Sequence, residues 1–117
     1  MKITVNVINA ADARTIQEVN YNAHAEILNN TRTEVIENIV AILNAKIRIS
    51  EEPYVHLDIK NSMLKNLPSE YALGAMKTIE TIYENAGYRV WMDEYSTTTK
   101  KTKKKSFYIS LYYGKDA

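Results

Sequence analysis

Two stretches near the C-terminus decide the fold: Tyr88-Arg89-Val90-Trp91-Met92-Asp93-Glu94-Tyr95 and Phe107-Tyr108-Ile109-Ser110-Leu111-Tyr112-Tyr113. In both stretches the side chains alternate with a period of two, which is typical of half-buried β-strands. The segment between them, residues 96–106, is rich in threonine and lysine, so we expect a mobile loop there. The whole region is therefore predicted to be a C-terminal β-hairpin.

The alternation also divides the hairpin side chains between two faces of a sheet, because neighbouring residues of a strand point to opposite sides. The apolar set that we expect to face the helices is Val90, Met92, Phe107, Ile109 and Leu111. Trp91, Tyr108 and Tyr112 then share the opposite face. The sequence thus predicts an aromatic surface on the side of the sheet that the helices leave bare.

Three helices are predicted ahead of the hairpin. The first follows Asn9, a residue type that caps helices. Its apolar stripe consists of Ile16, Val19, Ala23 and Ile27. Thr31 and Glu34 have the spacing of a capping box, which predicts the start of a second helix, although one long bent helix remains an alternative. The third has Ser69 as its cap and runs to about Ala86, and Gly87 follows at the position where a helix C-terminus favours positive φ.

Two further strands complete the predicted sheet. Residues 2–8 alternate between apolar and polar, and residues 54–60 alternate again, with Val55, Leu57 and Ile59 on the inner side. The predicted fold class is therefore α+β, with three helices packed on one face of a small, mostly antiparallel sheet that ends in the β-hairpin.

The composition indicates a single globular domain over residues 1–117. Of these residues, 45% are hydrophobic and 25% are charged, with three glycines and two prolines. The chain has no cysteine, which excludes disulfides and thiolate metal sites. No apolar run approaches the roughly 18 residues of a membrane span, and the first residues lack the apolar stretch of a secretory signal. We therefore expect a cytoplasmic protein with no membrane partner.

Basic residues are concentrated beside the aromatic face. The net charge is +1, and five of the fifteen Lys and Arg residues lie within 100–105. Aromatic rings stack on nucleobases, and basic side chains contact phosphate. The candidate ligand-binding residues are Arg89, Trp91, Lys100, Lys103, Lys104, Tyr108 and Tyr112. Three interpretations of the aromatic face stay open: a subunit interface, a ligand platform, or plain cross-strand pairing.

Catalytic and metal chemistry find little support in the sequence. His56 and Asp58 share a strand face, so they could form a base and its orienting carboxylate, but a surface polar pair is the simpler interpretation. No serine or other nucleophile is placed by the sequence to complete such a site. No metal-ligand spacing occurs. We therefore expect neither enzymatic activity nor a metal or other cofactor.

Part of the chain resembles a pattern that is common in small bacteriophage-encoded proteins. The matching segments are Asn85-Ala86-Gly87-Tyr88-Arg89-Val90, Phe107-Tyr108-Ile109-Ser110-Leu111-Tyr112 and the Ala-Ala-Asp-Ala-Arg helix start at residues 10–14, and the resemblance covers about half of the chain. This sequence departs from the pattern in its long lysine-rich loop and its longer second helix. Proteins of this type include accessory proteins, virion-associated proteins and inhibitors of bacterial defence, and the pattern transfers no functional residue.

Taken with the aromatic and basic hairpin, the resemblance leads to one leading hypothesis. We expect a phage counter-defence protein that sequesters a nucleotide second messenger as a homo-oligomer, without catalysis. The alternatives are an inhibitor that binds a host defence protein, in the manner of an anti-CRISPR protein, and a virion assembly component.

Overall fold

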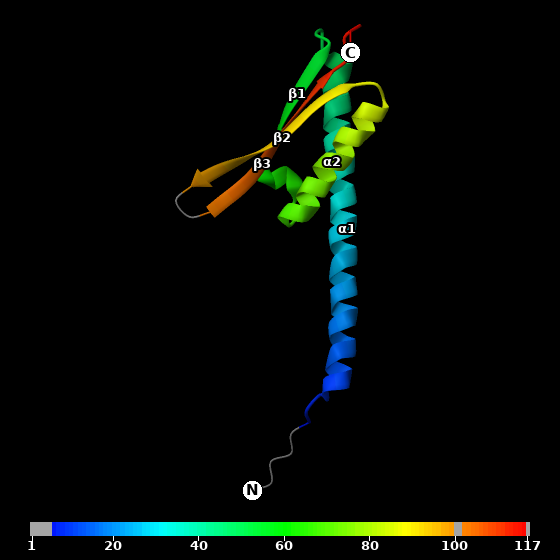
Figure 1. The fold of residues 1–117 in the computed structure, drawn as a ribbon, viewed down its shortest axis with the longest axis vertical. Helices are drawn as coiled ribbons and strands as arrows, with labels where there is room; N and C mark the ends of the chain where they lie inside the picture. Colours follow the sequence, from blue (N-terminus) through cyan, green and yellow to red (C-terminus); the bar gives the residue numbers. More distant parts are fainter. Residues whose placement is uncertain (1–5, 100–101, 117) are drawn as a thin grey trace.

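The computed structural model describes residues 6–99 and 102–116, and the side chains of residues 6–95 and 106–116. In chain order the elements are α1 (Ala10–Ile49), β1 (Tyr54–Ile59), the 3-10 helix η1 (Asn61–Leu64), α2 (Ser69–Asn85), β2 (Arg89–Thr99) and β3 (Thr102–Tyr112) (Figure 1). Helices and a sheet in one chain confirm the predicted α+β class.

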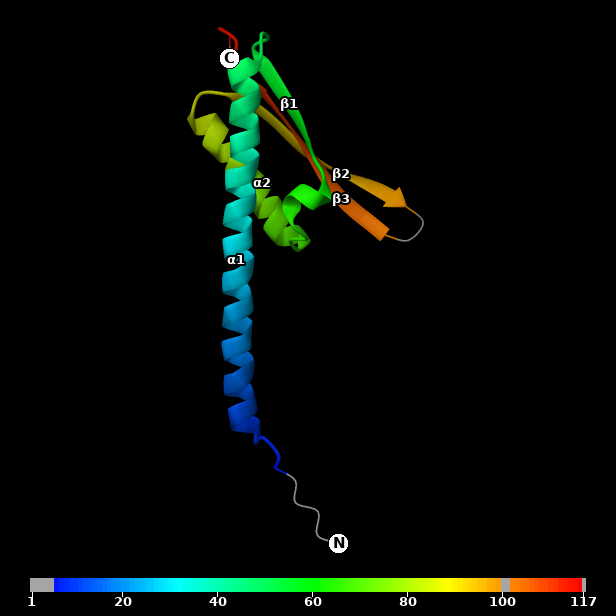
Figure 2. The same cartoon turned by 180° about the vertical axis from the view of Figure 1, so that it is seen from behind.

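The three strands form one antiparallel sheet in the order β1-β3-β2. The last strand of the chain is therefore the central one, and it pairs on both sides. Ser110 of β3 lies opposite His56 of β1 and opposite Trp91 of β2, which fixes the register of all three strands. Both α-helices lie on one side of this sheet, as the two opposite views in Figures 1 and 2 show.

The core lies between the inner face of the sheet and the two helices. Phe107, Ile109 and Leu111 of the central strand are at most 1% exposed. They pack with Val35, Ile39 and Leu43 of α1, with Ala72, Ala75, Met76, Ile79 and Tyr83 of α2, and with Val55 and Ile59 of β1. Val90 and Met92 pack against the same cluster. The predicted inward set of the hairpin is confirmed.

The prediction of three helices is wrong, because the first two are one continuous helix of 40 residues. Neither glycine nor proline occurs between residues 10 and 49 to interrupt it. The hydroxyl of Thr31 does not cap a new helix but donates to the carbonyl of Ile27 at 2.9 Å, and Thr33 donates likewise to Asn29 at 3.1 Å. Such bonds to the carbonyl four residues back are made inside a helix. The described residues thus contain two α-helices and the short η1.

Only the second part of α1 packs on the domain. The first residue of the helix to reach the core cluster is Leu28, and the first to be fully buried is Val35. The preceding part projects away from the domain (Figure 1). The stripe that we expected to pack, Ile16, Val19, Ala23 and Ile27, is exposed throughout. This prediction failed because periodicity identifies an apolar face but does not identify what covers it.

Two strand boundaries also differ from the prediction. The predicted strand at 2–8 lies partly outside the described residues, and the described part, from Asn6 on, has no regular structure. The predicted loop 96–106 is mostly strand, because β2 continues to Thr99 and β3 begins at Thr102. Threonine favours strands, so the Thr-rich segment extends the pairing of the hairpin. The turn between the two strands lies outside the described residues.

The ends of α2 fix the start of the hairpin. Pro68 occupies the cap position, so Ser69 is the first helical residue and not the cap that we expected. At the other end Gly87 has φ +97, as predicted, and its amide donates to Glu84 while the amide of Tyr88 donates to Tyr83. These two bonds form a Schellman motif, which turns the chain directly into β2.

The described helices include none that is long and apolar enough to cross a membrane.

The hydroxyl of Tyr83 ties α2 to α1, and it gives a test of this packing. It donates to the side-chain oxygen of Asn44 at 2.8 Å and lies 3.2 Å from the carbonyl of Val40. Burial, with a smaller contribution from Tyr88, raises the pKa of Tyr83 to about 12. A raised pKa of a phenol means that the fold favours the neutral form, so this stabilisation is present below pH 10 and is lost as the pH rises towards 12.

Tyr83→Phe should lower the free energy of unfolding by about 1 kcal/mol at neutral pH, because the hydrogen bonds to α1 are lost. Its stability should also fall less steeply than that of the wild type above pH 10. Urea denaturation across this pH range measures both effects, with Tyr21→Phe on the exposed helix as the control. Equal alkaline slopes for Tyr83→Phe and the wild type would contradict the assignment.

Candidate ligand-binding face

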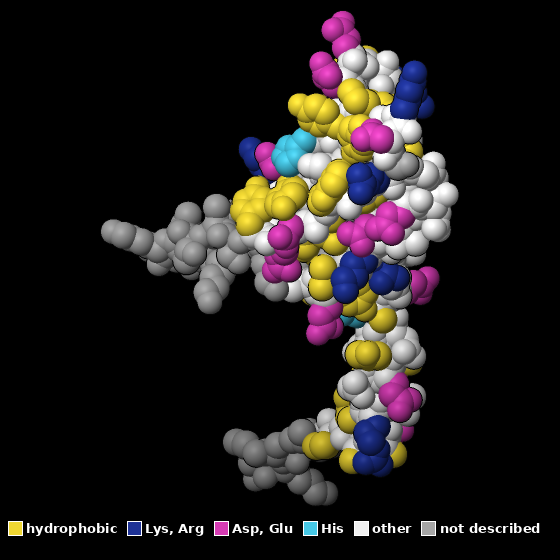
Figure 3. Space-filling model, turned by 45° about the horizontal axis from the view of Figure 1, so that its top comes forward, with side chains coloured by type: hydrophobic (Ala, Val, Ile, Leu, Met, Phe, Trp, Pro, Cys, Tyr) yellow, Lys and Arg dark blue, Asp and Glu magenta, His cyan; other side chains and the backbone are white. Residues whose placement is uncertain are grey.

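The side of the sheet opposite the helices carries a continuous set of polar and aromatic side chains. We call this surface the bare face. It consists of Tyr54, His56 and Asp58 on β1, Tyr108, Ser110 and Tyr112 on β3, and Arg89, Trp91, Asp93 and Tyr95 on β2. Figure 3 shows hydrophobic side chains gathered on the body of the molecule beside the hairpin, with a histidine among them and acidic side chains at their margin.

The three aromatic residues that the sequence singled out lie together on the bare face, as predicted. Trp91 pairs with Ser110, which stands between Tyr108 and Tyr112 along the central strand. Trp91 is therefore the diagonal neighbour of both tyrosines, at a spacing of roughly 7–8 Å that aromatic side chains can bridge. Trp91 is 52% exposed, and both tyrosines are half-buried. The geometry provides a broad, open aromatic platform.

Arg89 stands at one end of this platform. Its guanidinium carbon lies 6.0 Å from the centre of the Trp91 ring, within the range of a weak cation–π contact. Arg89 is also directly opposite Tyr112 in the register. Among the outward side chains of the bare face it is the only permanent cation, so any anion bound by the described part of this face has to approach Arg89.

Tyr112 is held in place by the C-terminal turn. Its hydroxyl donates to the carboxylate of Asp116. This bond raises the pKa of the Tyr112 phenol and lowers the pKa of Asp116. A Cβ atom added at Gly114 would overlap the Tyr112 ring, so only glycine allows the turn to pass this close. The ring of Tyr112 is thus oriented before any ligand arrives.

The centre of the bare face holds a hydrogen-bonded chain of which the sequence indicated only the polar pair His56 and Asp58. His56 Nδ1 lies 2.7 Å from the hydroxyl of Ser110, and His56 Nε2 lies 3.1 Å from Asp58. The His56 ring is also 5.8 Å from the ring of Tyr108. The sequence places no serine near His56, because Ser110 is 54 residues away and only the pairing of β1 with β3 brings it there. The signal that would have found it is the register of these two strands.

Ser110, His56 and Asp58 resemble a nucleophile, a base and an orienting acid, but the surroundings do not suit acyl transfer. Such chemistry needs backbone N–H donors aimed at the developing oxyanion. Ser110 lies in the middle of the central strand, whose backbone is hydrogen bonded to β1 on one side and β2 on the other. The backbone amides beside Ser110 therefore donate to the neighbouring strands and are not aimed at an oxyanion. The contacts of His56 with Ser110 and Asp58 fix the plane of the His56 ring next to Tyr108.

Two of the predicted lysines, Lys103 and Lys104, have their backbones on a two-stranded extension of the sheet. Strand β1 ends opposite Phe107, and β2 and β3 continue beyond it as a ribbon (Figure 1). The backbones of Lys103 and Lys104 pair with Thr98 and Thr97 in this ribbon. Lys100 lies outside the described residues, and so do the side chains of Lys103 and Lys104. Their proposed contact with a ligand stays a prediction.

Two features modify the charge of the bare face. Asp58 and Asp93 lie on either side of Tyr108, so carboxylates flank the central ring. At the β1 edge a hollow of about 330 Å³ opens between the strand and the end of α1, and its lining includes Lys46, Tyr54 and His56. Glu52 also lines this hollow and offsets the charge of Lys46. An anion would therefore avoid the Asp58–Asp93 row and approach Arg89.

In the part of the chain that the structure describes, no group of three or more His, Asp and Glu side chains is placed to hold a metal ion. Comparison of the chain with protein-family models, with curated proteins and with solved structures finds no significant match. Its function has to be inferred from the bare face and from the surfaces around it.

The contrast between Trp91 and Phe107 tests whether the platform exists for stability or for binding. Phe107→Ala should lower the free energy of unfolding by about 3–5 kcal/mol, because Phe107 is 1% exposed and its removal leaves a cavity. Trp91→Ala should cost less than about 1 kcal/mol, since its ring is half in solvent. Chemical denaturation of both variants measures the difference. A loss at Trp91 comparable to that at Phe107 would mean that the tryptophan is part of the core.

Proposed function

We propose that this protein is a non-enzymatic binding protein whose bare face takes up a nucleobase-bearing anion. The observation that carries the proposal is the placement of Trp91 diagonally between Tyr108 and Tyr112 on a sheet face that no helix of the described chain covers. An antiparallel sheet with helices on one side and aromatic rings on the other is a surface on which bases can stack. Each stacked base contributes about 1–3 kcal/mol of binding free energy.

Positive charge near the platform supports an anionic ligand. Arg89 is next to both Trp91 and Tyr112, so a phosphate attached to a base on the platform lies within its reach. Lys46 borders the hollow at the β1 edge, but Glu52 lines it as well, so Arg89 is the main contact for phosphate among the described side chains. The lysines at 100–105 would add attraction of longer range. Contacts of this kind weaken as the salt concentration rises.

The proposal extends to the role expected from the sequence. A protein that sequesters a nucleotide second messenger needs a binding surface and no chemistry. A His56 ring held in place, beside a Ser110 whose neighbouring amides are hydrogen bonded within the sheet, suits that role. Phage origin, counter-defence and a cytoplasmic site of action stay predictions, since neither the fold nor the comparisons bear on them.

One observation favours a second candidate, in which the bare face binds a protein effector. Asp58 and Asp93 place two carboxylates around Tyr108, which would repel a polyanion but would attract a basic protein surface. Tyrosine and tryptophan are also frequent in protein interfaces. A partner protein that co-purifies in equal amounts and is lost with Asp93→Lys would favour this candidate.

Trp91 reports directly on the proposed site, because it is the only tryptophan of the chain. We expect its fluorescence to change on titration with members of a panel of cyclic dinucleotides, cyclic oligonucleotides and single-stranded oligonucleotides at low salt. The small and the polymeric members of the panel distinguish a messenger from a nucleic acid. Trp91→Ala, followed by calorimetry, should weaken binding roughly 10- to 100-fold, since one stacking contact is lost.

Tyr21→Ala serves as the matched control, because Tyr21 is an exposed aromatic residue on the projecting helix and should leave the affinity unchanged. Arg89→Ala should weaken binding and reduce its dependence on salt. If no member of the panel changes the Trp91 fluorescence or gives heat at low salt, the nucleotide proposal is rejected.

A further inference from the structure

Strand β2 leaves one edge of the sheet open. It pairs only with β3, because the strand order is β1-β3-β2. From Arg89 to Thr99 it keeps one constant register with β3, so it has no bulge, and it contains neither proline nor lysine. Bulges, proline and lysine are common means of preventing an edge strand from pairing with another chain. The edge of β2 lacks all three.

A hydrogen bond at the start of β1 shows which backbone groups point to this open edge. The amide of Tyr113 donates to the carbonyl of Pro53, directly opposite, at 2.8 Å. In an antiparallel pair, opposite residues alternate between those that bond each other and those that do not. Counting along β3, the backbone of Ser110 therefore bonds to β2, where its partner is Trp91. The residues on either side of Trp91 then turn their amide and carbonyl groups to the open edge.

Two of these outward amides are available to another chain, and they lie symmetrically about Trp91. They belong to Val90 and Met92, which have no hydrogen-bond partner on this side within the described chain. The next outward amides are already used. The amide of Tyr88 closes the end of α2, and the amide of Glu94 donates to the side chain before it at 2.8 Å. A partner strand can thus pair here over a short stretch centred on Trp91.

The opposite edge of the sheet, along β1, is less open. By the same alternation the carbonyl of Tyr54 points outward, and the hydroxyl of Ser50 donates to it at 3.2 Å. The end of α1 also borders this strand, since Lys46 and Ile49 line the hollow beside it. The edge of β2 is therefore the better surface for strand pairing.

We propose that two copies of this chain pair along β2, antiparallel about a twofold axis that passes beside Trp91 and runs perpendicular to the sheet. Such an axis keeps the helices of both copies on one side of the joined sheet. Val90 of one copy exchanges both backbone hydrogen bonds with the partner's Met92, and Met92 does the same with the partner's Val90. Trp91 lies opposite the partner's Trp91, so the two bare faces become one continuous face.

The available amides select this register. An axis beside Val90 would place Met92 opposite the partner's Tyr88, and an axis beside Met92 would place Val90 opposite the partner's Glu94. The amides of Tyr88 and Glu94 are already hydrogen bonded within their own chain. A slip by a single residue would bring inward side chains opposite outward ones. The axis beside Trp91 avoids all of these conflicts.

The charges on the two sides of Trp91 match the same register. Arg89 and Asp93 are each two residues from Trp91, and both are exposed. Neither forms an ion pair with another side chain in the described part of the chain. They lie roughly 13 Å apart along one strand, too far to pair with each other. In the dimer Arg89 lies directly opposite the partner's Asp93, whereas an axis beside Asp93 would place two aspartates opposite each other.

This pairing leaves the proposed binding site usable. A carboxylate takes two of the N–H donors of a guanidinium, so Arg89 keeps further donors for a phosphate. The rings of Trp91, Tyr108 and Tyr112 stay on the open side of the sheet, and the partner adds a second set beside them. The dimer needs no ligand, so it can be tested without a nucleotide and independently of the proposed function.

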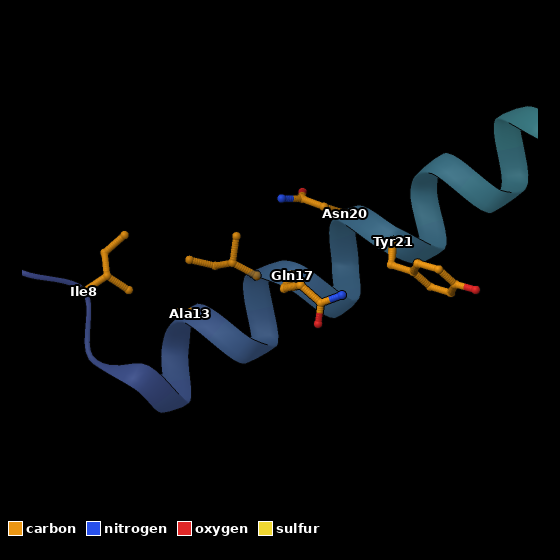
Figure 4. A pocket seen from close by; sticks show the side chains of 6 residues that line it. Ile8, Ala13, Gln17, Asn20 and Tyr21 are labelled. Atoms are coloured by element: carbon orange, nitrogen blue, oxygen red, sulfur yellow. The ribbon is translucent and has the colours of Figure 1, made fainter.

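The exposed apolar side chains of α1 offer no comparable pattern. An open hollow of about 490 Å³ lies there between Ile8, Ile16 and Tyr21 (Figure 4). Its lining carries no charged side chain, and the backbone groups inside a helix bond along the helix. Neither charge nor a free amide selects a partner at this hollow, whereas both do so at β2.

The oligomeric state of the full chain tests the proposal. Sedimentation velocity at about 200 µM should give twice the chain mass of 13.4 kDa, with dissociation on dilution because the interface is short. Arg89→Asp and Asp93→Arg should each give a monomer, because like charges then face each other. An equal mixture of these two variants should form dimers again, because each introduced charge faces an opposite charge of the other variant.

Arg14→Asp, the same change at an exposed position of α1, is the matched control and should remain a dimer. A monomeric wild type, a dimer of either charge variant alone, or a mixture that stays monomeric would overturn the proposal.

Cysteine cross-linking tests the register, since the chain has no cysteine of its own. Opposite residues of a non-bonded pair have Cα atoms roughly 4.5 Å apart, which suits a disulfide. Trp91→Cys should therefore form an intermolecular disulfide on mild oxidation, and Tyr95→Cys, exposed on the same face of β2, should not. Cross-linking at Tyr95→Cys, or its absence at Trp91→Cys where the wild type is a dimer, would reject the proposed pairing.

Discussion

The burial of Phe107, Ile109 and Leu111 beneath the two helices is the constraint on which the rest of the structure depends. These residues belong to the central strand, which pairs with both neighbours, so their inward direction fixes the direction of every side chain of the sheet. A slip of one residue would bury Tyr108 and Ser110 and expose the core. The bare face therefore follows from the packing of the opposite face.

The molecule has two exposed surfaces with large apolar side chains, and they differ in chemistry. The bare face combines rings with hydrogen-bonding and charged groups, and its rings are oriented by the Arg89, His56 and Asp116 contacts. The exposed aliphatic side chains of residues 10–27 of α1, Ile16, Val19 and Ile27, lack such groups and lie outside the core. We accordingly assign ligand binding to the sheet.

The sequence predicted the parts of the fold that depend on local alternation. The faces of β1, β2 and β3, the end of α2 at Gly87 and the grouping of Trp91 with the two tyrosines are confirmed, whereas the described part of the predicted strand at 2–8 has no regular structure. The sequence did not predict that α1 is continuous. The capping pattern at Thr31 and Glu34 is local, and it does not show whether the residues before Thr31 already form a helix that continues through it. The sequence also missed the neighbour of His56, because Ser110 comes next to it only through pairing across 54 residues. Long-range register is not encoded in periodicity.

The central claim is that the bare face, and no other surface, receives the ligand. The most direct measurement is the nuclear magnetic resonance spectrum of the full chain with and without a bound nucleotide. We expect the largest shifts at the indole N–H of Trp91 and at the amides of β2 and β3 around Arg89 and Ser110, with the α1 signals unchanged. Shifts confined to α1 and η1, with the Trp91 signal unmoved at saturating ligand, would contradict the account.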